Sequence, residues 1–453
     1  MTSLWFQAAL LPGGWASQVR IVATPAGRIA EVTSGVPPAP QDERHAIGLP
    51  GMPNLHSHAF QRGLAGLTER RGESQDSFWS WRELMYQFVG RLDPEQIEAI
   101  SALAYAEMLE AGFTHVGEFH YLHHDPAGMP YADPAELAAR VAAAAAHSGI
   151  GLTLLPVFYA HGGFGGTPPA ARQRRFLNDP ARFGRLLEAS RAAVQGLPGA
   201  VVGVAPHSLR AVTPQELSEV LALAPGAPVH LHIAEQVREV EDCVAWCGQR
   251  PIEWLLAHAE VGPRWCLVHA TQATGAELAG IAASGAVAGL CPMTEASLGD
   301  GIFPADRFLQ VRGRIGIGSD SNVRLDAAEE LRLLEYGQRL ALRARNVLAG
   351  AGGASTGRTV FEAALAGGTQ ALRPGAAGLA AGESFDLVTL NAQDPALAAH
   401  RGDEILDSWI FCGGRSLIDC VWRAGVRLVS AGVHRDRAAI RVRYAQALQR
   451  LVS

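Results

Sequence analysis

Histidines and carboxylates, the side chains that bind divalent metal ions, stand at the ends of four short apolar segments of this chain. The residues concerned are His56, His58, His232, Glu235, His269 and Asp320. Residues i and i+2 of a strand point to the same side, so His56 and His58 would project together. A single His-x-His pair is often coincidence, and the prediction therefore depends on the whole set.

Three imidazoles and one carboxylate form a suitable ligand set for one catalytic divalent ion, and Zn²⁺ is the ion we expect. The assigned metal ligands are His56, His58, His232 and Asp320. His230 lies two residues before His232, on the same face of the strand but deeper, so we interpret it as structural. Histidine-rich sites also accept iron, manganese and other ions, and the sequence does not select among them.

Glu235, His269 and Asp320 are the predicted catalytic residues. Zinc lowers the pKa of a water molecule to about 7, so an adjacent carboxylate can move protons at neutral pH. Asp320 would help to deprotonate the attacking water, and Glu235 would pass a proton to a leaving nitrogen. His269 would polarise the substrate or stabilise the attacking hydroxide. The alternative for Glu235 is a charge at a helix start, but the ligand just before it favours catalysis.

Eight strand-like segments alternate with helical segments from about residue 50 onward. We expect the strands at residues 51–58, 114–121, 151–160, 200–206, 228–234, 265–270, 286–291 and 314–320. Asp-Pro and Thr-Pro pairs start several of the helices, which include 94–111, 133–147, 213–223 and 274–284. This pattern predicts an α/β fold, a (β/α)₈ TIM-like barrel with its site at the carboxyl ends of the strands. No G-x-G-x-x-G follows the first strand, which argues against a dinucleotide-binding fold.

The two ends of the chain contain further strand-like segments outside the barrel region. They lie at residues 17–23, 28–33, 384–390, 408–412, 418–423 and 426–430, and helices are expected at 360–372 and 436–452. We predict that both ends build one small β-sandwich domain. The predicted limits are 1–49 for its first part, 50–372 for the barrel and 373–453 for its second part with the terminal helix.

Composition excludes several classes of protein. The chain has 453 residues, 48% of them hydrophobic and 18% charged, which rules out a largely disordered protein. Its net charge of −6 gives no indication of nucleic-acid binding. There is no apolar run of membrane-spanning length and no basic segment before an apolar one at the N-terminus. We therefore expect a soluble cytoplasmic protein that does not bind membranes.

Lysine is absent, so all 38 basic residues are arginine. Schiff-base chemistry, a lysine-anchored pyridoxal phosphate, a P-loop and a metal pair bridged by carbamylated lysine are thereby excluded. The 6 cysteines contain no CxxC pair. In a chain of this length we expect them to be mostly buried, inert thiols rather than disulfides or metal ligands.

The motifs together resemble one family. Residues 50–63, which contain His56, His58 and Gln61, are similar to the formimidoylglutamate deiminase (N-formimino-L-glutamate iminohydrolase) family. This family belongs to the mononuclear, zinc-dependent deaminase branch of the amidohydrolase superfamily. Segments 117–121, 205–210, 232–236 and 299–304 match it as well, so the resemblance extends over nearly the whole chain.

The resemblance implies hydrolysis of N-formimino-L-glutamate to N-formyl-L-glutamate and ammonia in histidine degradation, by a homodimer. It implies five substrate contacts: Gln61, Arg82, Tyr121, His207 and Arg210. Arginine binds carboxylates with two parallel hydrogen bonds, which suits a dicarboxylate, although most of the arginines must lie on the surface. We expect Asn322 and Met293 to depart from the family pattern. Such departures would affect the details of the metal site and the pocket, but not the class of reaction.

Two other functions remain open on this evidence. A deaminase of guanine or another purine would need stacking groups, and Phe78, Trp79 and Trp81 could supply them. A catalytically inactive barrel that only binds a ligand or a protein would be expected to lack a metal ligand or Glu235. All of these residues are present, which favours an enzyme.

Overall fold

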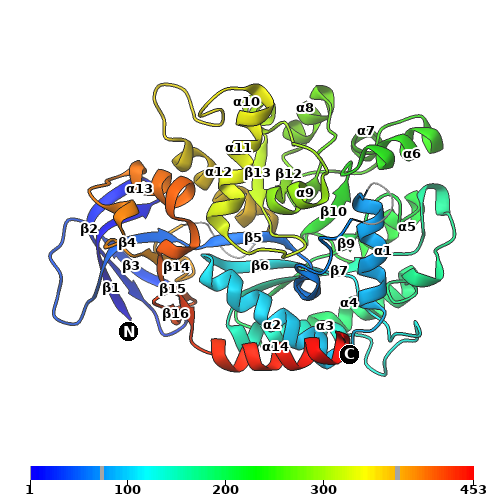
Figure 1. Cartoon of the computed structure of the whole chain (residues 1–453), viewed down its shortest axis with the longest axis horizontal. Coiled ribbons are helices and arrows are strands. Elements are labelled where there is room, and N and C mark those ends of the chain that lie inside the picture. Colours follow the sequence, from blue (N-terminus) through cyan, green and yellow to red (C-terminus); the bar gives the residue numbers. More distant parts are fainter. Residues whose placement is uncertain (1, 72–75, 373–377, 453) are drawn as a thin grey trace.

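The structure, a computed structural model, describes residues 2–71, 76–372 and 378–452. A barrel and a smaller β-sheet domain lie side by side (Figure 1). The barrel strands are β5 (Met52–Ser57), β6 (Phe113–His120), β7 (Gly151–Phe158), β8 (Val201–Val202), β9 (Ala205–Pro206), β10 (Val229–Ile233), β11 (Trp265–His269), β12 (Val287–Leu290) and β13 (Arg314–Ile317). They pair in parallel, and bridges from Val204 to Val229 and from Ser57 to Asp320 close the circle. The predicted (β/α)₈ barrel is confirmed.

The fourth strand position differs from the prediction, because residues 200–206 form two short strands, β8 and β9, instead of one. Gly203 lies between them. A Cβ atom at this position would stand 2.6 Å from the side chain of Leu155 and 2.7 Å from the backbone oxygen of Pro228. The flanking segments of the barrel therefore approach Gly203 so closely that a larger residue would not fit between the two short strands.

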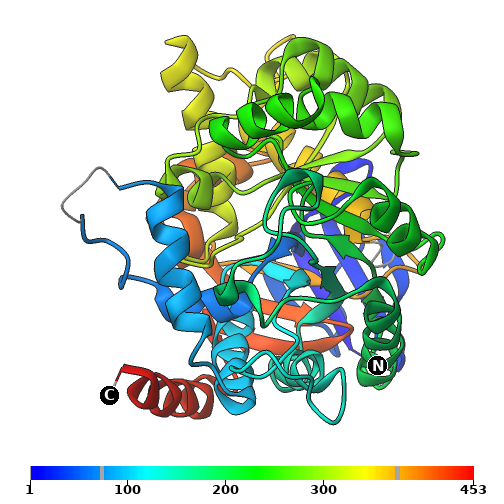
Figure 2. The same cartoon turned by 90° about the vertical axis from the view of Figure 1, so that its right-hand side faces the viewer.

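Helices pack around the outside of the barrel (Figure 2). They are α1 (Phe78–Val89), α2 (Pro94–Glu110), α3 (Glu136–Ser148), α4 (Pro180–Val194), α5 (Pro214–Ala222), α6 (Val237–Cys247), α7 (Pro251–His258), α8 (Gly275–Ser284), α9 (Pro292–Leu298), α10 (Ala305–Gln310) and α11 (Ala327–Leu342). Asp93 and Thr213 cap α2 and α5 as predicted, by accepting the N–H groups of Gln96 and Glu216. Asp133 instead accepts the N–H of Ala135 in a turn, and α3 begins only after it.

Helix α12 (Thr356–Leu372) covers the bottom of the barrel, at the end opposite the strand ends that carry the histidines. The carbonyl oxygen of Leu372 accepts a hydrogen bond from Thr153 Oγ1 in β7 at 3.0 Å. His230 Nε2 lies 3.1 Å from the carbonyl oxygen of Ala371. His230 therefore contacts α12 at the bottom of the barrel, in agreement with a structural role.

Both ends of the chain contribute to one small β domain, as predicted. Its strands form one sheet of eight, in the order β17-β16-β15-β14-β4-β1-β2-β3, where the prediction was a β-sandwich. These are β1 (Ser3–Leu11), β2 (Gly14–Ala23), β3 (Ile29–Thr33), β4 (Glu43–Pro50), β14 (Leu387–Leu390), β15 (Ile418–Arg423), β16 (Val426–Ser430) and β17 (Val433–His434). A bridge between Arg28 and Ser384 folds the β3 edge back towards β14 over a core that includes Phe6 and Trp422. Strands β1 and β4, which join the two halves, were not predicted. The exact domain limits stay a prediction.

The strand predicted at residues 408–412 is wrong. Helix α13 (Asp403–Ser408) continues directly into a π-helical turn, Trp409–Gly413. The consecutive residues Trp409 and Ile410 are both buried, and Trp409 packs edge-on against Phe361 of α12 with ring centroids 5.9 Å apart. Burial of adjacent residues suits a helical turn between two layers better than a strand with one buried face. Single 3₁₀ turns occur at Ala59–Leu64, Phe164–Gly166, Ala171–Gln173, Pro395–Leu397 and Gly414–Leu417.

The terminal helix α14 (Arg437–Val452) packs on α2, as Figure 1 shows. Arg443 pairs with Glu98 at 2.7 Å, and Arg437 pairs with Glu107 at 3.3 Å.

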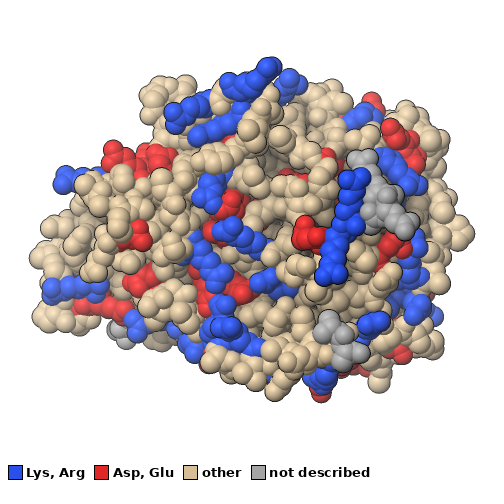
Figure 3. All heavy atoms as spheres, viewed as in Figure 1, with Lys and Arg blue, Asp and Glu red and all other residues tan. Residues whose placement is uncertain are grey.

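Acidic and basic side chains are interspersed over the face seen in Figure 3. Among the described residues, no helix combines the length and apolar character that a membrane crossing needs. All six cysteines are free, and four of them are buried.

Candidate metal centre and catalytic cavity

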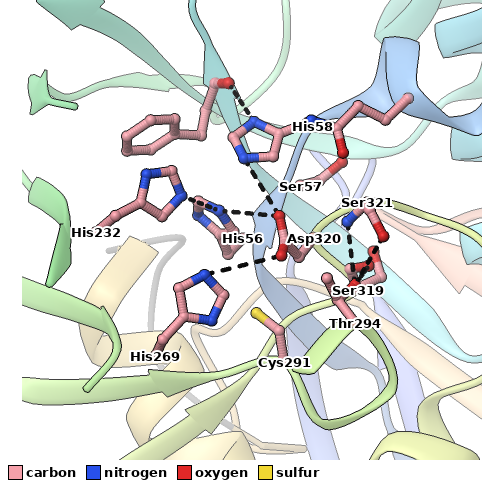
Figure 4. Close-up of polar contacts among 12 residues, drawn as sticks. His56, Ser57, His58, His232, His269, Cys291, Thr294, Ser319, Asp320 and Ser321 are labelled. Atoms are coloured by element: carbon pink, nitrogen blue, oxygen red, sulfur yellow. Dashed lines mark hydrogen bonds and ion pairs between the residues drawn. The ribbon is translucent and has the colours of Figure 1, made fainter. Parts of the chain in front are cut away.

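Four buried side chains converge at the carboxyl ends of the barrel strands (Figure 4). His56 lies in β5 and His58 just after it, His232 lies in β10, and Asp320 follows β13. His56 Nε2 is 3.0 Å from His232 Nε2 and 3.5 Å from Asp320 Oδ1, and His58 Nε2 is 3.2 Å from the same oxygen. Their ligand-type atoms all lie within 4.8 Å of one another. The structure thus brings together the four residues expected to bind a metal.

The tautomer of His58 tests whether this cluster suits a cation. Its Nδ1 lies 2.9 Å from the carbonyl oxygen of Phe119, which can only accept, so Nδ1 donates the ring proton. Burial lowers the pKa of His58, so the ring is neutral and its Nε2 carries a lone pair that faces the Asp320 carboxylate. Two acceptors at this separation repel each other unless a cation lies between them. The donor set therefore fits a divalent metal ion.

Burial also keeps the other two histidines of the cluster neutral. It lowers the pKa of His56 to about 3 and that of His232 well below its usual value. Imidazole must be unprotonated to bind a metal, so this environment prepares both rings for that role.

The turn after β13 is fixed by Asn322, one of the two positions that differ from the expected family pattern. Its side-chain amide donates to Ser57 Oγ at 3.1 Å, to the carbonyl of His58 at 3.0 Å and to that of Asp320 at 2.9 Å. Asp320 and Asn322 both have positive φ, 44° and 56°, which asparagine tolerates better than most residues. Asn322 therefore holds Asp320 against the end of β5. Met293 lies in the first turn of α9, where its N–H donates to Glu330 at 2.9 Å.

Glu235 and His269 lie beside the metal cluster. Burial raises the pKa of Glu235 to about 7, which suits a proton-transfer group at neutral pH. His269 Nε2 is 3.9 Å from Glu235 Oε1 and 3.8 Å from Asp320 Oδ2, and its Nδ1 is 3.2 Å from Glu295 Oε1. Burial lowers the pKa of His269, but Glu235, Glu295 and Asp320 raise it more strongly, to about 10.

A second group of ligand-type side chains consists of His269, Cys291 and Glu295. Burial raises the pKa of the Cys291 thiol well above its usual value. A protonated thiol is a poor metal ligand, and Glu295 already binds the ring of His269. The first group is therefore the better metal site.

A cavity opens over the metal cluster and Glu235. All five predicted substrate contacts line it, namely Gln61, Arg82, Tyr121, His207 and Arg210. Gln61 donates to the hydroxyl of Tyr121 at 2.9 Å, while its own side-chain oxygen is buried without a partner among the described residues. The Nε atoms of Arg82 and Arg210 are also buried and have no hydrogen bond within the described part of the chain. The cavity thus contains polar groups in need of partners.

The two arginines reach the cavity from different elements. Arg82 lies on α1, where its guanidinium stacks on the ring of Trp79, 4.6 Å from the ring centroid. Arg210 follows β9, and its Nε lies 3.9 Å from Glu239 Oε1. Two separate cationic groups above the metal cluster suit a ligand with two carboxylates.

Sequence reasoning missed much of the cavity wall. The missed lining residues are Met85, Tyr86, Tyr159, Phe176 and Leu298. Tyr159 directly follows β7, so the rule that functional groups follow barrel strands would have found it. Tyr86 and Phe176 lie on α1 and on a loop, and no local signal marks them. Phe78 and Trp81, noted as possible stacking groups, do line the cavity.

Comparisons with known proteins show the family of this chain. A sequence model of the amidohydrolase family matches residues 47–428, and one described as "Formimidoylglutamate deiminase HutF, N-terminal domain" matches residues 1–46. A formimidoylglutamate deiminase of Pseudomonas aeruginosa is 53% identical over 438 residues, 96% of each chain. The chain belongs to the formimidoylglutamate deiminase family of amidohydrolases. It is accordingly a hydrolase with the family's barrel fold.

Solved structures of other amidohydrolases have the same architecture. An amidohydrolase from Brucella melitensis is 55% identical to this family member, covers 100% of both chains and has a TM-score of 0.97. An adenosine deaminase from Xanthomonas campestris with bound zinc covers 100% of this chain and 98% of its own at a TM-score of 0.80. Its identity is only 24%, so it shows the shared fold alone.

Proposed function

We propose that this amidohydrolase converts N-formimino-L-glutamate and water to N-formyl-L-glutamate and ammonia, a step of histidine degradation. The family and the 53% identity to the Pseudomonas aeruginosa enzyme support this reaction. The observation that carries the proposal is the cavity itself, where Arg82 and Arg210 stand above Glu235 and the histidine cluster. This arrangement suits a substrate with two carboxylates and a hydrolysable carbon–nitrogen bond.

His56, His58, His232 and Asp320 would hold one divalent ion, for which we propose Zn²⁺. When bound, such an ion lowers the pKa of water to about 7 and so supplies hydroxide at neutral pH. The zinc found in the adenosine deaminase neighbour supports this choice.

The remaining chemistry belongs to the protein's own side chains. Arg82 and Arg210 bind the two carboxylates and hold the formimino carbon above Glu235. Glu235 accepts a proton from the attacking water as the carbon–oxygen bond forms, and passes it to the terminal nitrogen of the tetrahedral intermediate. The remaining hydroxyl proton is then transferred through Glu235 to the same nitrogen, the carbon–nitrogen bond breaks, and ammonia leaves as the formyl carbonyl forms. His269, oriented by Glu295, stabilises the attacking oxygen.

The first test is ammonia release from N-formimino-L-glutamate by zinc-loaded protein, with N-formimino-L-aspartate and guanine in parallel. We expect strong turnover of the glutamate compound that is lost when a chelator removes the metal. Absence of turnover at full zinc content would overturn the substrate assignment.

A purine deaminase is the second candidate, because Phe78 and Trp81 line the cavity and could stack on a purine ring. An 8-oxoguanine deaminase of Pseudomonas aeruginosa is 27% identical over 67% of this chain. The two arginines favour the dicarboxylate, and turnover of guanine in the same assay would favour the purine.

We further propose that the enzyme acts in the cytoplasm as a homodimer on this small molecule alone. The six free cysteines agree with a reducing compartment. The dimer follows from the family resemblance, and sedimentation analysis would test it.

Replacing Arg82 by alanine should raise KM for N-formimino-L-glutamate about 10- to 100-fold, the value of one charge-assisted hydrogen-bond pair. Arg238→Ala is the matched control, because its guanidinium stacks on the same Trp79 ring at 4.9 Å but is exposed. Equal KM values for the two variants would contradict a role for Arg82 in carboxylate binding.

A further inference from the structure

Glu239, which lies in the first turn of α6, has a fully buried carboxylate. Its Oε1 accepts the N–H of Ala234 at 3.3 Å, and its Oε2 accepts the N–H of Glu235 at 3.1 Å. It therefore satisfies two buried backbone donors between β10 and α6. These donors belong to the residue proposed for proton transfer and to the one before it.

The backbone of Glu235 is held from its other side as well. Gln272 Nε2 donates to the carbonyl oxygen of Glu235 at 3.0 Å and to that of Asp300 at 2.7 Å. Because both peptide groups of Glu235 are fixed, the position of its carboxylate depends on Glu239 and Gln272.

The same Glu239 carboxylate is also the ion-pair partner of Arg210. Glu239 Oε1 lies 3.9 Å from Arg210 Nε. Arg210 is itself buried, and the Nε atom makes no hydrogen bond with any described residue. Burial lowers the pKa of Arg210, but Glu239 is the first of several groups that raise it above its usual value. One carboxylate therefore contacts both the proton-transfer residue and the substrate anchor.

We propose that Glu239 is a positioning residue that holds Glu235 and Arg210 in a fixed relation, so that a carboxylate bound at Arg210 brings the reacting carbon to Glu235. The roles of these two neighbours rest on the proposed function. Glu239 itself lies behind them and does not line the cavity described above. Glutamine at this position would turn an N–H towards a backbone donor or towards Arg210, and would remove the charge that the ion pair with Arg210 requires.

The test uses three variants: Glu239→Gln, Arg210→Lys and the double variant that combines these two changes. The control is Glu241→Gln, which changes an exposed glutamate on the same helix. We expect Glu239→Gln to lower kcat and to raise KM, each by about 10-fold. In the Arg210→Lys background it should still lower kcat but change KM less than about 2-fold, because contacting residues are not additive. Crystal structures of Glu239→Gln should show Glu235 and Arg210 displaced, and those of Glu241→Gln should not.

A purely structural role predicts a different result. Glu239→Gln would then lower the melting temperature, and it would change kcat and KM by the same factors in the wild-type protein and in the Arg210→Lys variant. That result, or undisplaced Glu235 and Arg210 in the crystal, would overturn the inference. If the wild-type protein fails to release ammonia from N-formimino-L-glutamate, the proposed function fails. The crystal structures would still decide whether Glu239 positions its two neighbours.

Discussion

Glutamine in place of Glu235 should lower kcat by about 10²- to 10⁴-fold, the contribution of a well-placed proton-transfer group, while the protein keeps its metal. Glutamine has nearly the same shape but cannot accept and return a proton. Burial raises the pKa of Glu235 to about 7, so the native side chain exchanges protons readily at neutral pH. Glu235 is not one of the four clustered side chains that can hold the ion. Ammonia release and zinc content, measured on the same preparations, check both parts.

Glu241→Gln, which removes an exposed carboxylate from the neighbouring helix, is the control and should retain full activity. If Glu235→Gln keeps more than about a tenth of wild-type activity, Glu235 does not carry the proton. If the variant loses zinc instead, Glu235 belongs to the metal-binding set. Binding of the product N-formyl-L-glutamate should be nearly unchanged, because Arg82 and Arg210 are intact.

The barrel and its metal cluster could be predicted because they follow from local patterns. Strands buried on both faces read as continuous apolar runs, and several of them end where a histidine or a carboxylate stands. Parallel strands in a closed barrel bring all their carboxyl ends to one rim, so His56, His232 and Asp320 meet although 264 positions separate the first from the last. No detailed knowledge of the packing was needed for that step.

The errors arose where long-range packing decides the local structure. Residues 408–412 contain apolar and aromatic residues that resemble a strand, but they pack against α11 and α12 as a helical turn. Strands β1 and β4 depend on pairing with each other and with β14, from the other end of the chain. Neither pairing leaves a signal within a short window of sequence.

The residues around the cavity also differ in how far the sequence alone could predict them. The predicted substrate contacts came from the family resemblance, because nothing in the local sequence distinguishes Arg82 or Arg210 from the other arginines. Glu239 was missed altogether, since a glutamate in the first turn of a helix is usually a capping or surface residue. Its importance is visible only in three dimensions, where its carboxylate meets Arg210 and the backbone of Glu235.

Asparagine in place of Asp320 should weaken metal binding at least about 100-fold and lower turnover about 10³-fold or more, because the proposed ligand set of three histidines and Asp320 would lose its carboxylate and with it a proton acceptor. Burial raises the pKa of Asp320, but the hydrogen bond with His56 and the charge of His269 lower it more, so the pKa of this carboxyl lies well below its usual value. Asparagine preserves the shape of the side chain and removes that charge.

Thermal unfolding with and without zinc separates this effect from misfolding. Zinc should raise the melting temperature of the wild-type protein, because a ligand that binds only the folded state stabilises it. Without metal, Asp320→Asn should melt close to the wild-type protein, since Asn322 and the backbone bridge to Ser57 still hold the turn. With zinc, its melting temperature should rise much less. Asp242→Asn, an exposed change on α6, should behave as wild type. Equal zinc-induced stabilisation of Asp320→Asn and wild type would remove Asp320 from the metal site and leave the three histidines to bind the ion without it.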